Sequence, residues 1–261
     1  MSIKKTYFLS DFHLGMDAQK TSAARERLVC RWFAQHQETA EALYLVGDVF
    51  DAWFEYKKVI PKGYARFFGA LATWRDAGIP IYFFTGNHDM WMFRYFSDEF
   101  GIPIYREPIT RIIQGKKFFI GHGDGLGPGD NGYKFLKKIF SNTYVQRIYS
   151  TIHPNIGLPL MHFFSDTSRN AQEDFKTSKF LGTEKEWLLQ FCENEIKTQF
   201  DIDYFIFGHR HLPINWLLSN GKSRYINLGE WMYATSFGSF DGEKFQIEFF
   251  EISEFSKIIK N

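Results

Sequence analysis

Five short apolar runs in this chain each end within one residue of a glycine or serine, which is followed by side chains that can bind metal ions. The runs are residues 6–9, 42–46, 79–84, 117–120 and 204–207. The segments that follow them are Ser10-Asp11-Phe12-His13, Gly47-Asp48, Gly86-Asn87-His88-Asp89, Gly121-His122-Gly123-Asp124 and Gly208-His209-Arg210-His211. Short, uninterrupted apolar runs are typical of strands covered on both faces. The pattern predicts a layered α/β protein whose polar groups gather beyond the strand ends, where such sheets bind ligands.

Helix-compatible segments separate several of these runs. We expect helices over residues 21–41, 63–77 and 183–199, the last with Thr183 as N-cap and Glu186 as its capping-box partner. The last fifty residues predict hairpins that turn at Ser219-Asn220-Gly221 and Asp241-Gly242. Residues 125–182 carry no strand pattern. We therefore expect one domain over residues 1–261, with a helical insertion at about 127–182 that acts as a lid.

The strand-end side chains have the composition of a two-metal site. Two divalent cations ~3.5–4 Å apart repel each other and need a shared anionic ligand, for which Asp48 is the candidate. The other predicted ligands are Asp11, His13 and His211 for one ion, and Asn87, His122 and His209 for the other. Mixed carboxylate, imidazole and amide donors favour Mn, Fe or Zn over Mg or Ca. One such motif alone is usually a turn or a structural histidine, but five in order predict a hydrolase of phosphate esters or anhydrides.

These motifs, from Asp11 to His211, resemble those of the calcineurin-like metallophosphoesterase superfamily. The resemblance implies an α/β (α+β) fold in which a two-sheet β-sandwich is flanked by helices, with the dimetal site at the sheet edge. It also implies a catalytic segment, Asn87-His88-Asp89, in which His88 contacts the phosphate and protonates the leaving group while Asp89 orients His88. Proton delivery of this kind contributes ~10²–10⁴-fold to a rate. The alternative is that His88 only supports neighbouring ligands.

A second resemblance is more specific. His122-Gly123-Asp124-x-Leu126, followed by Asp130 and Tyr133 and then by a helical insertion, is similar to the UDP-2,3-diacylglucosamine diphosphatases of lipid A biosynthesis. The resemblance implies cleavage of the pyrophosphate of a UDP-linked diacyl sugar, two Mn²⁺ ions, and a cytoplasmic enzyme peripheral to the inner membrane. The substrate contacts that it implies are Asp130, Tyr133, Arg169, Lys176 and Lys179. That family usually has Gly-Asn-Arg-Asp where this chain has Gly-Asn-His-Asp at 86–89, so another phosphoester stays open as substrate.

The insertion combines apolar and basic residues within a nearly neutral chain. Residues 127–170 contain many large apolar side chains, five basic residues and two acidic ones, whereas the whole chain carries a formal charge of +1. An apolar groove with a basic rim suits an anionic lipid and an interfacial attachment. Phe135, Leu136, Ile139 and Phe140 could instead be the buried face of a lid helix, because their spacing is helical.

Composition excludes other classes. Nucleic-acid binders usually carry a basic domain or stripe, so we expect no nucleic-acid partner. Two cysteines make a disulfide framework implausible and suit a reducing compartment. The start of the chain shows no apolar signal region, and no run approaches the ~20 apolar residues of a membrane span. The remaining alternatives are a hydrolase of small phosphoesters such as nucleotides, and a non-catalytic lipid-binding or scaffold module.

Overall fold

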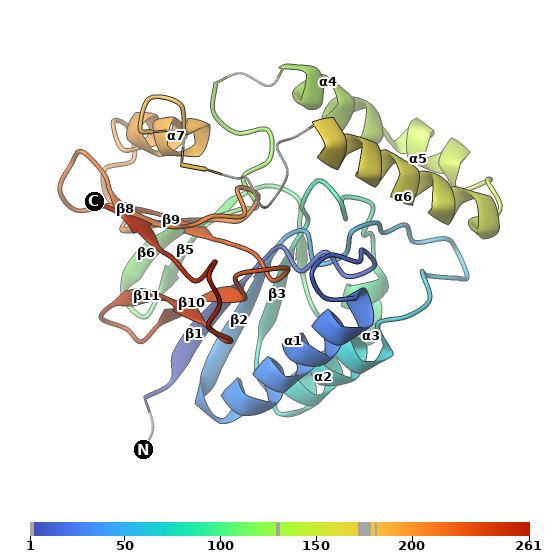
Figure 1. The fold of residues 1–261 in the computed structure, drawn as a ribbon, viewed down its shortest axis with the longest axis horizontal. Helices are drawn as coiled ribbons and strands as arrows, with labels where there is room; N and C mark the ends of the chain where they lie inside the picture. Colours follow the sequence, from blue (N-terminus) through green and yellow to red (C-terminus); the bar gives the residue numbers. More distant parts are fainter. Residues whose placement is uncertain (1–2, 129–130, 172–178, 181) are drawn as a thin grey trace.

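Two six-stranded sheets form the centre of the computed structural model, which describes residues 3–128, 131–171, 179–180 and 182–261 (Figure 1). The first sheet has the spatial order β11-β10-β1-β2-β3-β4. Its strands are β1 (Lys5–Leu9), β2 (Ala40–Val46), β3 (Ile81–Phe84), β4 (Ile104–Tyr105), β10 (Ser236–Phe240) and β11 (Phe245–Phe249). Strands β1 to β4 run parallel, and β10 joins β1 antiparallel.

The second sheet has the order β12-β8-β9-β7-β6-β5. Its strands are β5 (Ile109–Ile113), β6 (Lys116–Ile120), β7 (Tyr204–Phe207), β8 (Pro213–Leu217), β9 (Arg224–Leu228) and β12 (Ile259–Lys260). Strands β6, β7 and β9 are parallel neighbours, whereas β5 and β8 are antiparallel. Both sheets are therefore mixed, and each contains a parallel block whose carboxyl ends lie at one edge.

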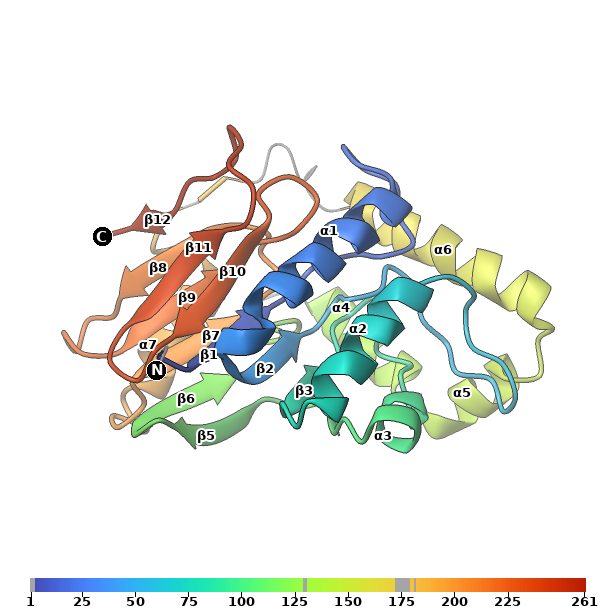
Figure 2. The same ribbon diagram turned by 90° about the horizontal axis from the view of Figure 1, so that it is seen from below.

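Three apolar layers hold the sandwich together. The sheets pack on each other through an aromatic-rich cluster that includes Phe8, Tyr44, Phe118 and Phe240. Helices α1 (Ser22–His36), α2 (Ala65–Asp76) and α3 (Tyr95–Phe100) cover the outer face of the first sheet, as Figure 2 shows. Helix α7 (Trp187–Glu195) packs on the outer face of the second sheet. A short 3₁₀ turn, Gln37–Thr39, links α1 to β2.

The insertion contains three helices that lie together at one end of the molecule (Figure 1). They are α4 (Asn131–Phe140), α5 (Thr143–Tyr149) and α6 (Pro154–Ala171). A small cluster joins them to the body, with Tyr149 packed against Phe54 and Trp91. The Trp91 indole N–H donates to the Phe140 carbonyl at 2.7 Å, which fixes the end of α4. Within the described ranges, no helix is long and apolar enough to cross a bilayer.

The predicted two-sheet α/β architecture is confirmed, and both expected hairpins are present as β8–β9 and β10–β11. The prediction for the helix over residues 183–199 was wrong at its start. The helix begins at Trp187, and Glu186 rather than Thr183 occupies the N-cap position. The cause is tertiary, because both Glu186 carboxylate oxygens bind the Arg210 guanidinium, at 2.8 and 2.9 Å, and are not used in a capping box.

Candidate metal centre

The fold brings the five polar segments to one edge of the sandwich. Asp11 and His13 follow β1, Asp48 follows β2, and Asn87 follows β3, all in the first sheet. The remaining predicted ligands come from the second sheet, where His122 follows β6, and His209 and His211 follow β7. Because these strands are parallel neighbours within their sheets, their carboxyl ends converge.

The first group contains Asp11, His13, Asp48 and His211, whose donor atoms all lie within 4.8 Å of one another. The His211 Nε2 atom lies 2.9 Å from Asp11 Oδ1 and 3.2 Å from His13 Nε2. His13 Nε2 is 3.8 Å from Asp48 Oδ2. Donors each ~2.1 Å from one tetrahedral ion are spaced by about 3.4 Å, so this arrangement fits a shared cation.

The second group contains Asp48, His122 and His209. His122 Nε2 lies 3.1 Å from Asp48 Oδ2 and 3.3 Å from Asn87 Oδ1. The other ring nitrogen of His122 is 2.9 Å from the Val46 carbonyl oxygen, which can only accept a hydrogen bond. Nδ1 therefore carries a proton, and Nε2 is the ring atom that faces the centre and can bind an ion once its own proton has left, as in metal-binding histidines. Asp48 belongs to both groups, so its carboxylate can serve two ions.

The backbone at these positions is strained. Asp11, His13, Asp48, His209 and His211 all have φ between 44° and 68°, and they make up five of the eight non-glycine residues with positive φ in the described chain. L-residues rarely adopt this left-handed conformation, which costs about 1–3 kcal/mol each and concentrates at functional sites. The strain therefore marks the strand ends independently of the side-chain chemistry.

Two glycines allow the carboxylates to sit against neighbouring backbone. A Cβ atom at Gly86 would overlap the Asp48 carboxylate, and one at Gly208 would overlap that of Asp11. Only glycine permits such an approach without displacing the carboxylate. The first glycines of the Gly-Asn-His-Asp and Gly-His-x-His motifs thus contribute to the site because they have no side chain, which leaves room for the two carboxylates.

Arg25 holds the loop that carries Asp11 and His13. This fully buried side chain of α1 donates from Nε to the Phe12 carbonyl and from Nη2 to the His13 carbonyl, both at 2.6 Å. It also donates to the Met16 carbonyl at 2.5 Å. A planar guanidinium can bind several carbonyls in one fixed arrangement. Arg25 therefore determines the path of the loop after β1.

Electrostatics favour a positive charge at the centre. Burial lowers the pKa of both His13 and His209 to about 4, so these rings are neutral donors at pH 7. Burial also opposes charge on His122, but the adjacent Asp48 carboxylate raises its pKa to about 10. Burial alone would raise the pKa of Asp48, yet His122 and His88 hold it well below its ordinary value. An ionised, buried carboxylate that draws a proton onto a neighbouring histidine is suited to bind a divalent cation.

His88 is held by residues that differ from the prediction. Its Nδ1 lies 2.7 Å from Ser165 Oγ of α6 and 3.2 Å from the Asp51 carbonyl oxygen. The Asp89 carboxylate, which was expected to orient His88, instead accepts from the backbone N–H groups of Gly86 at 2.7 Å and Val49 at 2.9 Å. The role of Asp89 in orienting His88 stays a prediction. Asp89 fixes the loops after β2 and β3, and Ser165 and Asp51 hold His88.

Residues expected to contact substrate are only partly described. Lys179 is exposed, and its backbone carbonyl accepts from Arg210 at 3.1 Å. Asp130 and Lys176 lie outside the described residues, as do the side chains of Tyr133 and Arg169. Within the described part of the chain, none of these five side chains has a contact that tests its predicted role in substrate binding.

Sequence reasoning missed several residues of this site. Asp51 is buried and lies 3.4 Å from His13 Nδ1, and its spacing in Gly47-Asp48-x-x-Asp51 was a usable signal. Asp124 was named in its motif but given no role; it forms a 2.6 Å ion pair with Lys137 and so ties α4 to the loop after β6. Ser165 carried no sequence signal, because its contact depends on how the insertion packs.

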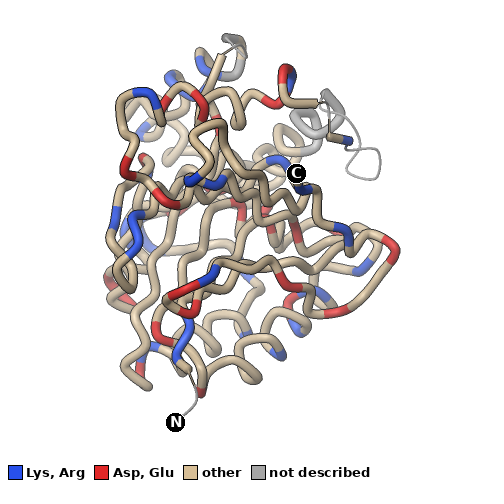
Figure 3. The backbone as a smooth tube through the Cα atoms, turned by 90° about the vertical axis from the view of Figure 1, so that its left-hand side faces the viewer, with Lys and Arg blue, Asp and Glu red and all other residues tan. Residues whose placement is uncertain are grey.

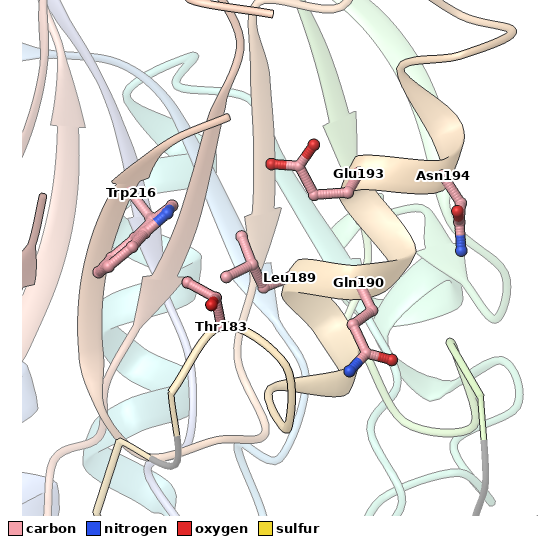
Figure 4. A pocket seen from close by; sticks show the side chains of 6 residues that line it. All are labelled: Thr183, Leu189, Gln190, Glu193, Asn194 and Trp216. Atoms are coloured by element: carbon pink, nitrogen blue, oxygen red, sulfur yellow. The ribbon is translucent and has the colours of Figure 1, made fainter. Parts of the chain in front are cut away.

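A cavity of about 310 Å³ lies elsewhere, between α7 and β8. Figure 4 shows its lining side chains, among them Leu189, Gln190 and Trp216. None of the lining residues belongs to the two candidate metal groups or to the segment around His88. This cavity is therefore separate from the candidate metal centre.

The fold and this cluster agree with the comparison to known families. The family model described as calcineurin-like phosphoesterase matches residues 4–213, and the chain belongs to this family of metal-dependent phosphoesterases. The His/Asp clusters accordingly indicate divalent metal ions as cofactors.

Curated relatives share this chain's full length or most of it. A protein of Porphyromonas gingivalis named UDP-2,3-diacylglucosamine hydrolase is 34% identical over 96% of this chain and 99% of its own length. A protein of the same name from Proteus mirabilis is 29% identical over 87% of this chain and 90% of its own. Among solved structures, the phosphoesterase YfcE of E. coli aligns with a TM-score of 0.46 and 17% identity, over 94% of this chain and 93% of that one.

Proposed function

We propose that this protein hydrolyses the pyrophosphate of UDP-2,3-diacylglucosamine, releasing UMP and 2,3-diacylglucosamine 1-phosphate, with two Mn²⁺ ions. The observation that carries the proposal is the match to the hydrolase of Porphyromonas gingivalis over nearly the full length of both chains. In the proposed site, Asp11, His13, Asp48 and His211 hold one ion. Asp48 is shared with the second ion, whose other ligands are Asn87, His122 and His209.

The bound ions and His88 would have different roles in the hydrolysis. The two cations supply water activation and charge neutralisation on the phosphoryl oxygens. The His88 ring lies 4.8 Å, centroid to centroid, from that of His13, so it borders the first group. Because its Nδ1 is bound to Ser165 and Asp51, only its Nε2 is left to deliver a proton to the leaving oxygen.

The insertion supports a lipid substrate and an attachment to the inner membrane surface on its cytoplasmic side. Eight of the thirteen exposed large apolar side chains in the described chain belong to α4, α5 and α6, among them Ile148 at 69% and Phe163 at 62% exposure. This exposure argues against the buried lid-face interpretation for Phe135, which is 65% exposed. Concentrated apolar exposure marks a lipid or partner surface, and basic side chains beside it favour anionic lipids.

Turnover of two substrates tests the proposal. The Mn²⁺-loaded protein should release UMP from UDP-2,3-diacylglucosamine much faster than it hydrolyses bis-p-nitrophenyl phosphate at equal concentration. Phe163→Ser should weaken hydrolysis of the lipid nucleotide and leave the aryl ester unaffected. The matched control is Phe200→Ser, because Phe200 is 75% exposed but follows α7, outside the insertion. Efficient cleavage of the small ester with none of the lipid nucleotide would refute the substrate assignment.

A hydrolase of small phosphoesters is the second candidate, and His88 in place of the arginine usual in the diphosphatases favours it. The same assay, extended to cyclic nucleotides, separates the two. A nuclease fits less well, because basic and acidic segments are interspersed over the tube in Figure 3 and the formal charge is +1. A scaffold role would require the metal-replete protein to hydrolyse no phosphate ester.

A further inference from the structure

The insertion reaches into the site at His88. Ser165 lies on α6, and its Oγ is 2.7 Å from His88 Nδ1 and 3.1 Å from Asp51 Oδ2. Ser165 is buried, with 8% of its surface exposed, as is Asp51 with 1%. The hydrogen bonds of Ser165 to His88 and Asp51 are therefore shielded from water, and a hydrogen bond in such a low-dielectric environment is stronger than one in water.

The direction of each hydrogen bond follows from what its partners can do. The Asp51 backbone carbonyl, 3.2 Å from His88 Nδ1, only accepts, so Nδ1 carries a proton. The hydroxyl of Ser165 donates to the Asp51 carboxylate and accepts from Nδ1–H of His88. The resulting chain runs from Asp51 through Ser165 to His88 and holds the ring in one tautomer and one orientation.

We infer that Ser165 is a positioning residue through which the insertion sets the orientation and tautomer of His88. The inference rests on the proposed function for the catalytic importance of His88. It gives the insertion a role in the chemical step besides any contact with acyl chains. In the protonated ring, Nδ1–H is engaged by Ser165, and Nε2–H is the proton that can be transferred to the leaving oxygen.

Variants at Ser165 separate this role from simple packing. Ser165→Cys keeps the size of the side chain but substitutes a weak acceptor, and Ser165→Thr retains the hydroxyl. We expect the cysteine variant to lower kcat by about 10- to 100-fold, by analogy with the partners that orient metal-binding histidines. KM and metal content should change little, and Ser165→Thr should restore most of the rate. Ser150→Ala is the matched control, because its hydroxyl bonds only to the exposed Arg147 carbonyl on the same insertion.

Leaving-group dependence gives a readout that a packing defect would not produce. Phenolate needs protonation more than the acidic p-nitrophenolate does. The loss in Ser165→Cys should therefore be larger for diphenyl phosphate than for bis-p-nitrophenyl phosphate. Equal losses on the two esters, or a rate like that of Ser150→Ala, would overturn the inference.

A nuclear magnetic resonance measurement tests the inference even if no substrate is turned over. In the Zn²⁺-loaded wild-type protein, the ¹⁵N spectrum of His88 should show a protonated Nδ1 with slow hydrogen exchange. In Ser165→Cys this proton should exchange faster. An unchanged His88 spectrum would refute the role of Ser165, whereas inactivity of the wild-type protein on every ester would refute the proposed function alone.

Discussion

Replacement of Arg25 by methionine tests how the loop after β1 is held. The two carbonyls that Arg25 Nε and Nη2 bind at 2.6 Å, those of Phe12 and His13, are buried. Each buried acceptor left without a partner costs about 1–3 kcal/mol, so the pair costs about 2–6 kcal/mol. Removal of a buried charge returns part of its desolvation penalty. We expect Arg25→Met to lower the free energy of unfolding by a net amount of about 2–4 kcal/mol.

Urea unfolding in EDTA, followed by circular dichroism, measures this loss without any contribution from metal binding. The matched control is Arg27→Met, two residues along the same helix, where the side chain is exposed and makes only a 3.4 Å contact to the Ala23 carbonyl. Exposed substitutions usually change stability by less than about 0.5 kcal/mol. If both variants unfold at the same urea concentration, the assignment of loop positioning to Arg25 is incorrect.

Three further results are expected. Asp48→Ala should abolish hydrolysis and reduce the content of both ions, measured by atomic absorption, because this carboxylate lies in both ligand groups; retention of one full equivalent would argue against sharing. His88→Ala should lower kcat by about 10²–10⁴-fold with metal content unchanged, and parallel loss of both would make His88 structural. As the pH falls from 6.5 to about 4, the metal-free protein should lose stability. In this range His13 and His209 bind protons in the unfolded chain but stay neutral in the folded protein, where their pKa is about 4. Urea midpoints in EDTA should vary less with pH in His209→Asn than in the wild-type protein.

Local patterns were sufficient to predict most of the strands. The run Tyr204–Phe207 is β7 without any change of bounds, because four consecutive buried apolar residues leave few alternatives. The strands β4 and β12 escaped prediction, since each has two residues and no pattern can be read from such a length. The start of α7 was mispredicted because Arg210, far along the chain, takes the Glu186 carboxylate.

Some residues of the candidate site could likewise be predicted from the sequence, and others could not. Strand-end position indicated Asp11 and His122 because parallel neighbours deliver their carboxyl ends to one edge. The partner of His88 could not be found from sequence, since Ser165 is 77 residues away and belongs to a helix whose packing no local pattern encodes. The family resemblance implied a role for Asp89 beside His88, but it gave no information on the backbone amides of Gly86 and Val49 that this carboxylate binds.

The two sheets contribute unequally but jointly to each group of donors. With ions bound as proposed, His211 of the second sheet and Asp11 of the first grip the same cation, and Asp48 and His122 do so for the other. Each ion then cross-links the two sheets, because it has ligands from both. Chelation would remove these metal-mediated links as well as reactivity. The two sheets would then be joined at that edge by hydrogen bonds such as that from His209 N–H to the Asp11 carboxylate, and they would separate there more readily on heating.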